Sequence, residues 1–325
     1  MLPRRDVGRY GAKQRRRSAR TRSAAKCLPA VASESALANV DVVRLIATFL
    51  NAVELCQVKA TCKALGSANE EATFNELSIT DEAARRVFES ASDEEKILLP
   101  RYDGEGWIEL YHHLLMLRAR LSFDQLVGRY VGHRGGDTAV VQGMIIHGLH
   151  RLSQAICGGY IMRAGKHWAT FTSSSGFSHN QAVGVIRPLP GWDKKGLDNF
   201  YPCHSPRRNL QHERTARWKG CVHYCCVRMI DGSSCFSEVH LRPLCFWSDW
   251  KGDEIRSDWV GQDNYNEDCT TLGMLLDLCN GTLSLYQNGQ RLGTLMNGLA
   301  GEYCWTTGFS NGGDVSIQRS YSVNM

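Results

Sequence analysis

The sequence has no run of 18 or more apolar residues and no apolar core of the signal-peptide type near its start. A helix that crosses a bilayer needs about 20 apolar residues in succession, so we expect no membrane partner. Without a secretion signal, the 13 cysteines are expected to be reduced thiols. We therefore expect a cytoplasmic or nuclear protein.

The chain also lacks the short motifs on which common enzyme sites are built. No phosphate-binding glycine loop of the Walker or dinucleotide type is present. Zinc sites usually contain close cysteine pairs of the C-x₂-C kind, and none occurs. No recognised signature of a nucleophilic cysteine surrounds any thiol. We therefore expect no catalytic residue, no cofactor and no metal, which means that the protein is not an enzyme.

A region rich in Cys and His, residues 203–245, tests this expectation. If residues 220–229 form a strand, Cys221, His223 and Cys225 share one face and Cys226 lies on the other. Cysteine also behaves as a small buried hydrophobe. A zinc site and an ordinary strand interior are both open interpretations, and the missing cysteine pairs favour the interior.

Positive charge is concentrated at one end of the chain. Residues 1–26 contain ten Lys/Arg and a single acid, which gives them a charge of +9, so the rest carries −4 of the net +5. We therefore predict a disordered basic tail over residues 1–35 and no specific nucleic-acid partner on the folded part. The cluster from Lys13 to Arg22 fits a nuclear localisation signal, a transit peptide or a solvated tail.

The next segment has the apolar spacing of helices. Two short helices separated by a break at residues 51–52 are predicted over residues 38–66. They cannot bury both of their faces alone, so they need further helices or a partner. Residues 67–128 form a predicted helical linker region, in which an amphipathic helix over residues 107–121 is expected to pack on the domain that follows.

From about residue 130 the apolar period becomes two and turn residues become dense. Short strands without intervening helices predict a sandwich or barrel over residues 129–322. The connection over residues 188–219 is long enough to suggest a function. The candidate strands are 138–147, 155–162, 166–173, 182–187, 220–229, 272–279, 282–286, 291–296, 303–308 and 314–319.

Two Asn-Gly pairs punctuate residues 272–293. Asn280-Gly281 and Asn288-Gly289 supply the positive φ angles that two-residue hairpin turns require. Three consecutive antiparallel strands are the simplest geometry, with Leu283 and Leu285 turned toward the core.

A longer pattern surrounds these turns. It consists of Leu276-Asp277, Gly281-Thr282-Leu283, Tyr286, Asn288-Gly289, Gly301 to Trp305 and Val315 to Ile317, with Gly165 to Phe171, Val183 to Pro188, Trp218 and Gly220 upstream. Through these residues the chain from 130 to 320 resembles the SPRY domain. The resemblance implies a bent antiparallel β-sandwich of the concanavalin-like kind, whose loops bind peptides or protein surfaces and which has no catalytic residues.

Residues 38–65 resemble a second family, the F-box, through Ile46, Phe49-Leu50, Glu54-Leu55 and Cys62-Lys63. The family's opening Leu-Pro is replaced by Ala38-Asn39. The resemblance implies docking on a Skp-type adaptor of a cullin–RING ubiquitin ligase; the alternative is an ordinary helical pair. The docking residues would be Val42, Val43, Ile46, Phe49, Leu50, Leu55, Val58, Cys62 and Leu65.

Tryptophans and acids alternate near residues 247–268 and make a candidate target-binding loop. Tryptophan is a preferred anchor of protein interfaces, and acids around it favour a basic partner segment. Tryptophans that anchor a structural loop, and paired carboxylates for sugar hydrolysis, are the alternatives. The residues concerned are Trp247, Trp250, Asp253, Glu254 and Trp259.

Together these features predict a protein-interaction adaptor. Its SPRY-like domain would recognise a target protein or peptide, and its F-box-like segment would connect that target to a cullin–RING (SCF-type) ubiquitin ligase. A stand-alone SPRY protein-binding module and a carbohydrate-binding sandwich are the two alternatives.

Overall fold

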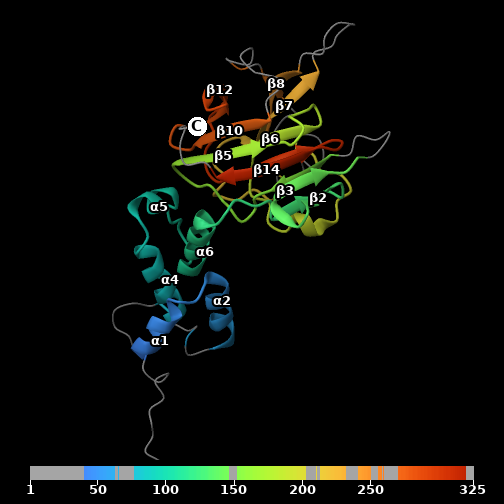
Figure 1. The fold of residues 1–325 in the computed structure, drawn as a ribbon. Coiled ribbons are helices and arrows are strands. Elements are labelled where there is room, and N and C mark those ends of the chain that lie inside the picture. Colours follow the sequence, from blue (N-terminus) through green and yellow to red (C-terminus); the bar gives the residue numbers. More distant parts are fainter. Residues whose placement is uncertain are drawn as a thin grey trace, which may run out of the picture.

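The computed structural model describes residues 40–62, 65, 77–145, 152–202, 210, 213–231, 241–249, 255–257, 259 and 270–319. In this part of the chain a small helical unit precedes a β-sandwich (Figure 1). The predicted basic tail over residues 1–35, with the cluster from Lys13 to Arg22, lies outside the described residues. No helix in the described ranges is long and apolar enough to span a bilayer.

The helical unit is a cluster of short helices. Two of them begin with a capping box: the backbone N–H of Glu54 donates to Asn51 Oδ1 over 3.0 Å, and that of Glu95 donates to Ser92 Oγ over 3.2 Å. The helices are α1 (Val40–Ala47), α2 (Ala52–Thr61), α4 (Ile79–Glu89), α5 (Asp93–Leu98) and α6 (Trp107–Arg118).

The first two helices bury one face against α4 and α6. Leu55 of α2 is fully buried together with Leu110 and Leu114 of α6 and Ala84 of α4. The hydroxyl of Tyr111 donates to the Leu50 carbonyl oxygen over 3.2 Å. The expectation that the first helices need further helices is therefore confirmed for their inward face.

All paired strands of the sandwich run antiparallel, in two seven-stranded sheets. The first sheet has the order β1 (Gln125–Val127), β4 (Ser153–Ile156), β13 (Cys304–Phe309), β6 (Gln181–Ile186), β7 (Val222–Asp231), β8 (Leu241–Asp249) and β9 (Ile255–Ser257). The second has the order β12 (Gln290–Asn297), β11 (Thr282–Gln287), β10 (Thr271–Asp277), β5 (Lys166–Thr172), β14 (Asp314–Arg319), β3 (Asp137–Gly143) and β2 (Val131–Arg134).

The predicted mainly-β antiparallel sandwich, preceded by a small helical region, is confirmed. Leu283 and Leu285 are fully buried between the sheets, as their alternation indicates, and Phe171 stacks edge-on against Trp305. Strand β1 lies before residue 129, where the sandwich was expected to begin.

Strand β8 is absent from the predicted strands, because Pro243 interrupts the pattern. Proline has no N–H for a ladder and is confined to edges. The next strand, β9, pairs only with Cys245 to Trp247. Among the described residues, the part of β8 that contains Pro243 therefore has β7 on one side and no strand on the other.

The second Asn-Gly pair forms the expected two-residue turn, with φ of 51° at Asn288 and 74° at Gly289, between the paired Gln287 and Gln290. The first pair does not. Asp277 pairs with Thr282 across a four-residue loop, in which the Asp277 carboxylate accepts the N–H groups of Cys279 and Asn280. The side-chain cap replaces the tight turn, although three consecutive antiparallel strands still result.

The described residues of the long connection over 188–219 cover the outer face of the first sheet. Its short 3₁₀ helix, η2 (Trp192–Lys195), buries Trp192 against Phe200. Trp218 and Tyr224 of β7 belong to the same apolar cluster. Part of this segment is therefore a second core rather than a loop free to move.

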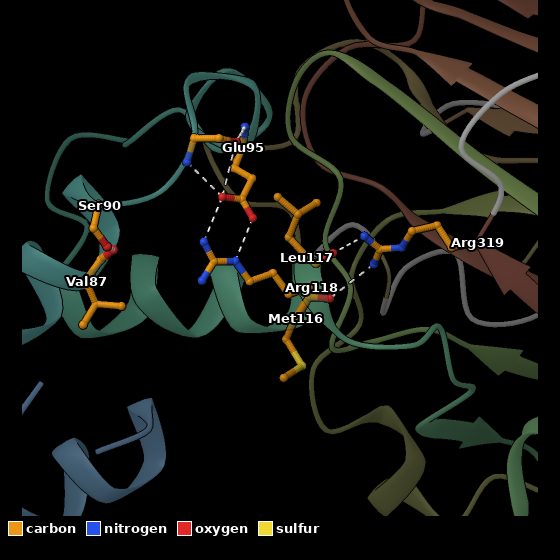
Figure 2. A network of polar contacts seen from close by, with 8 residues as sticks. Val87, Ser90, Glu95, Met116, Leu117, Arg118 and Arg319 are labelled. Atoms are coloured by element: carbon orange, nitrogen blue, oxygen red, sulfur yellow. Dashed lines mark hydrogen bonds and ion pairs between the residues drawn. The ribbon is translucent and has the colours of Figure 1, made fainter. Parts of the chain in front are cut away.

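Helix α6 is joined to the sandwich at its carboxyl end (Figure 2). Arg319 of β14 donates to the carbonyl oxygens of Met116, Leu117 and Ala119. The last carbonyls of a helix have no intrahelical partner, and here the final strand supplies one. On the other side Arg118 forms a two-pronged ion pair with Glu95 of 2.7 and 2.8 Å. The buried apolar side chains of α6 belong to the helical cluster. The helix therefore meets the sandwich through polar contacts and Tyr160, and the expected apolar packing on the sandwich is limited to that residue.

Candidate protein-binding surfaces

The outward side of the first two helices is apolar and exposed. Leu45 is 60 % exposed, Phe49 82 % and Val53 58 %, and Ile46 also faces solvent. Leu45 and Ile46 belong to α1, Phe49 lies in the turn that follows it, and Val53 belongs to α2. Large apolar side chains exposed together mark interaction sites. We call Leu45, Ile46, Phe49 and Val53 the docking face.

The predicted docking residues divide into three groups. Ile46 and Phe49 lie on the docking face. Leu55 is fully buried in the helical core, so it is not available to a partner, which corrects that prediction. The half-buried members are Val42, Val43, Leu50, Val58, Cys62 and Leu65.

Leu45 and Val53 were absent from the prediction. The break before α2 interrupts the helical spacing, so no periodic pattern joins Leu45 to Val53, and their exposure is known only from the structure. The F-box-like pattern predicted Leu55 instead. Such a pattern records the intervals between residues along the chain, but not the direction in which each side chain points.

A cleft of about 600 Å³ lies where α6 meets the sandwich. Helix α6 contributes Glu109 and His113, and the segment before β1 and its first residue contribute Asp124 and Gln125. The other lining residues come from residues 158–161, 188–194 and 213–218 and from Glu302 before β13. The cleft thus joins parts of the chain that are distant in sequence.

The cleft has apolar walls and several carboxylates. Ile161, Leu189, Pro190 and Trp218 supply apolar surface. Typical ligand sites combine such walls with a few polar groups.

Three of the carboxylates in the cleft already have cationic partners. Glu109 lies 2.9 Å from Arg217, and Glu302 lies 3.8 Å from the same guanidinium. Glu213 pairs with Lys195 over 2.8 Å. These carboxylates are therefore engaged within the protein.

Asp124 and Asp193 differ from the other carboxylates. Neither lies within 4 Å of a Lys or Arg among the described residues, whereas Asp124 Oδ2 accepts the Gly159 N–H over 2.8 Å. The Gln125 amide donates to Asp193 Oδ1 over 3.4 Å. Desolvation raises the pKa of Asp124, and the negative charge of Asp193 adds to that rise.

His113 lines the same cleft and is 8 % exposed. Its Nδ1 has no hydrogen-bond partner among the described residues. Burial lowers the pKa of His113 to about 3, and the positive charge of Arg163 acts in the same direction. The imidazole is therefore neutral near pH 7.

One group of side chains could in principle hold a metal ion. Ligand atoms of Glu105, Glu109 and His113 lie within 4.8 Å of one another. However, Arg163 lies 2.5 Å from Glu105, and Arg217 lies 2.9 Å from Glu109. A cation would have to displace two guanidinium groups, so this arrangement does not suit a metal.

The predicted target-binding loop is described only in part. Trp247 is half-buried in β8 and packs on the main core. Trp259 is buried, and its indole N–H donates to the Pro243 carbonyl oxygen over 2.9 Å. Its side chain therefore anchors the segment and does not present an aromatic surface to a partner, which corrects that prediction. Trp250, Asp253 and Glu254 lie outside the described residues.

The thiols of the Cys/His-rich region lie in strand interiors. Cys225 Sγ is 3.7 Å from Cys245 Sγ inside the main core, and Cys226 lies on the opposite face. The expected alternation fails at His223, which is the extra residue of a bulge and contacts Ser248 Oγ over 2.9 Å. No Cys/His ligand set converges in the described part of this region.

Comparison with known proteins gives no relative by sequence: no protein-family model and no curated protein matches the chain. Solved structures do match. A TRIM65 PSpry domain has 18 % identity over 64 % of this chain and 97 % of its own, with a TM-score of 0.35. Stonustoxin has 11 % identity over 61 % of this chain and 26 % of its own, with a TM-score of 0.35. The chain is also similar to the SPRY domain of human HERC1, at 12 % identity over 55 % of this chain and 87 % of that one, with a TM-score of 0.30.

Proposed function

We propose that this protein is an adaptor that holds a target protein through its sandwich and docks on a Skp-type adaptor of a cullin–RING ubiquitin ligase through its first helices. The observation that carries the proposal is the docking face. Phe49 exposes 82 % of its surface between Leu45 and Val53, although the inward side of the same helices is fully packed.

The energetics favour a partner on this face. Fully burying one large apolar side chain contributes about 1.5–3 kcal/mol. The docking face offers several such side chains within nine residues of chain. The F-box-like residues Ile46 and Phe49 belong to this face, which supports a Skp-type adaptor as the occupant.

The mechanism is proximity. One chain with two binding surfaces raises the local concentration of a target near a separate enzyme. The contacts of Arg319 with the end of α6 hold the helical unit against the sandwich. Helices α1 and α2 lie at the end of the helical unit away from the sandwich (Figure 1). A target bound to the sandwich is therefore presented in a constant direction relative to these helices.

The test is co-purification of the full chain with a Skp-type adaptor. We expect Phe49→Asp and Val53→Asp to abolish binding. Ile97→Asp is the matched control, because Ile97 is 65 % exposed but lies on α5, away from the docking face. Retained binding in Phe49→Asp, or equal loss in Ile97→Asp, would refute the ligase role and leave a stand-alone protein-binding module.

A further inference from the structure

We propose that the cleft between α6 and the sandwich binds a Lys or Arg side chain of the target, carried on an apolar segment, with its cation between Asp124 and Asp193. This inference rests on the target-holding half of the proposed function. It names the chemistry of the recognised segment, which the resemblance to a domain family does not supply.

The first argument is charge. In the described part of the chain, Glu109, Glu213 and Glu302 are all ion-paired, so the cleft's remaining negative charge is that of Asp124 and Asp193. Both carboxylates accept hydrogen bonds from neutral donors, and among these residues no Lys or Arg lies within 4 Å of either, although Lys194 also lines the cleft. Two neighbouring carboxylates without a counter-ion favour a ligand cation.

The second argument is that the two carboxylates are held in place. Gly159 donates its N–H to Asp124, and a Cβ atom at Gly159 would lie 3.0 Å from Asp124 Oδ2. Glycine at position 159 therefore lets its N–H reach the Asp124 carboxylate, whereas a larger residue would push that carboxylate away. The Gln125 amide contacts both the Leu189 carbonyl oxygen and Asp193. Pre-positioned groups reduce the ordering cost of binding.

The third argument is independent of the carboxylates. His113 is more than nine-tenths buried, lines the cleft, and has an Nδ1 without a partner among the described residues. A buried polar atom without a partner is costly, and a ligand or a ligand-ordered water can remove that cost. Because the imidazole is neutral, it does not repel a cation.

The apolar walls of the cleft indicate which kind of side chain carries the cation. Lys and Arg lay their methylene stems along apolar surface while the charged head stays on a polar group. Ile161, Pro190 and Trp218 provide such surface beside the carboxylates. A volume of about 600 Å³ exceeds one side chain, so neighbouring apolar residues of the segment also fit.

The chain's own basic tail is the competing occupant. Residues 13–22 read Lys-Gln-Arg-Arg-Arg-Ser-Ala-Arg-Thr-Arg and contain no large apolar side chain. A cleft with apolar walls therefore suits a mixed segment of a target better than this tail. The experiment includes the tail as an outcome.

The experiment selects binders for the full chain from a phage library of random peptides of about ten residues, which extend over roughly 30 Å. Recovered peptides are synthesised and their Kd is measured by fluorescence anisotropy. We expect a single Lys or Arg between apolar residues. Asp124→Asn/Asp193→Asn should weaken binding about tenfold, as should replacement of the peptide's Lys by Gln or of its Arg by citrulline. Added salt should weaken it too.

Asp198→Asn is the control, because Asp198 is exposed and pairs with Arg129 outside the cleft; its peptide affinity should match the wild type. Gly159→Ala tests positioning and should weaken the same peptides while leaving their preference for a cation intact.

Three results would overturn the inference. The first is that the library yields no enriched peptide, and the second is that the peptides bind the double variant as tightly as the wild type. The third is that peptides bind only after residues 1–26 are removed, which would assign the cleft to the tail. Skp-type adaptor binding is measured on the same variants and should not change. If the wild-type chain binds no peptide in a cation-dependent way but still binds the adaptor, this inference alone is refuted, whereas failure of the adaptor assay alone would refute the ligase role.

Discussion

Arg163 Nη1 lies 2.5 Å from Glu105 Oε1, and neither side chain is exposed to solvent. Glu105 precedes α6, and Arg163 lies between β4 and β5, so this ion pair joins the helical unit to the sandwich. Glu302 lies 3.2 Å from Arg163 Nε. Desolvation offsets much of the attraction in a buried ion pair, so this pair adds little net stability. Its main effect is to hold α6 in one orientation beside the cleft.

Arg163→Met leaves Glu105 buried without its cation. The expected loss is about 3–5 kcal/mol in the free energy of unfolding, measured by urea titration. The double variant Glu105→Gln/Arg163→Met removes both charges and should recover much of that loss. A double variant as unstable as Arg163→Met would contradict a specific ion pair.

The two sides of the first helices should respond differently to truncation. Phe49→Ser removes a side chain that is largely in solvent and should change the free energy of unfolding by less than about 0.5 kcal/mol. Leu55→Ala empties a buried site and should cost about 2–5 kcal/mol. Thermal and urea unfolding of both variants check this. Equal costs would mean that Phe49 is packed in solution.

Buried histidines should make stability depend on pH. Burial lowers the pKa of His113 to about 3 and that of His167 to about 4, from 6.5. Between about pH 6.5 and 4 the unfolded chain therefore binds protons that the native protein does not, so stability falls as the pH falls. Arginine partners lower the pKa of Glu82 and Glu95 to about 2 from 4.5, so their contribution is lost only at lower pH.

His113→Gln should remove one of these two contributions. Between pH 7 and pH 5 the wild type should lose about 2 kcal/mol more in unfolding free energy than the variant. Urea titrations at both pH values give the comparison. Parallel losses in the two proteins would show that His113 is protonated in the native state.

The hairpin turn at Asn288-Gly289 depends on a positive φ. Gly289→Ala places a side chain at φ of 74° and should cost about 1–2 kcal/mol. Gly132→Ala is the control, since Gly132 in strand β2 has no positive φ and its added Cβ would lie no nearer than 3.9 Å to Met144 Cε. It should leave thermal stability unchanged or raise it. Similar losses in both variants would point to a general effect of removing glycine.

Trp259 can be tested as an anchor. Trp259→Phe keeps an aromatic ring but loses the bond to the Pro243 carbonyl oxygen. The expected cost is about 1–3 kcal/mol for an unsatisfied buried acceptor, measured by urea unfolding. If the variant is as stable as the wild type but binds the target less tightly, Trp259 contacts the target, as the sequence predicted.

Local chemistry was sufficient to predict several features. Alternation along residues 282–286 directs Leu283 and Leu285 inward, and Asn288-Gly289 forms its turn wherever the two strands lie. Such features depend on bonds between close neighbours in the chain. The same kind of argument failed at Asn280-Gly281, because the carboxylate of Asp277 offers the loop a competing set of hydrogen bonds.

Apolar periodicity predicted an antiparallel β-domain, either a sandwich or a barrel, after a short helical region, because the period indicates which side chains turn inward. It does not indicate which side chains pack against one another. The burial of Leu55 beside an exposed Phe49, the anchoring of Trp259 and the ion pair of Glu105 with Arg163 are set by contacts between distant parts of the chain. The cleft likewise exists only because α6, β1 and the connection before β7 meet. The strand order of the first sheet positions β1 and this connection, while the contacts of Arg163 and Arg319 hold the helical unit beside them. No local pattern encodes such long-range contacts.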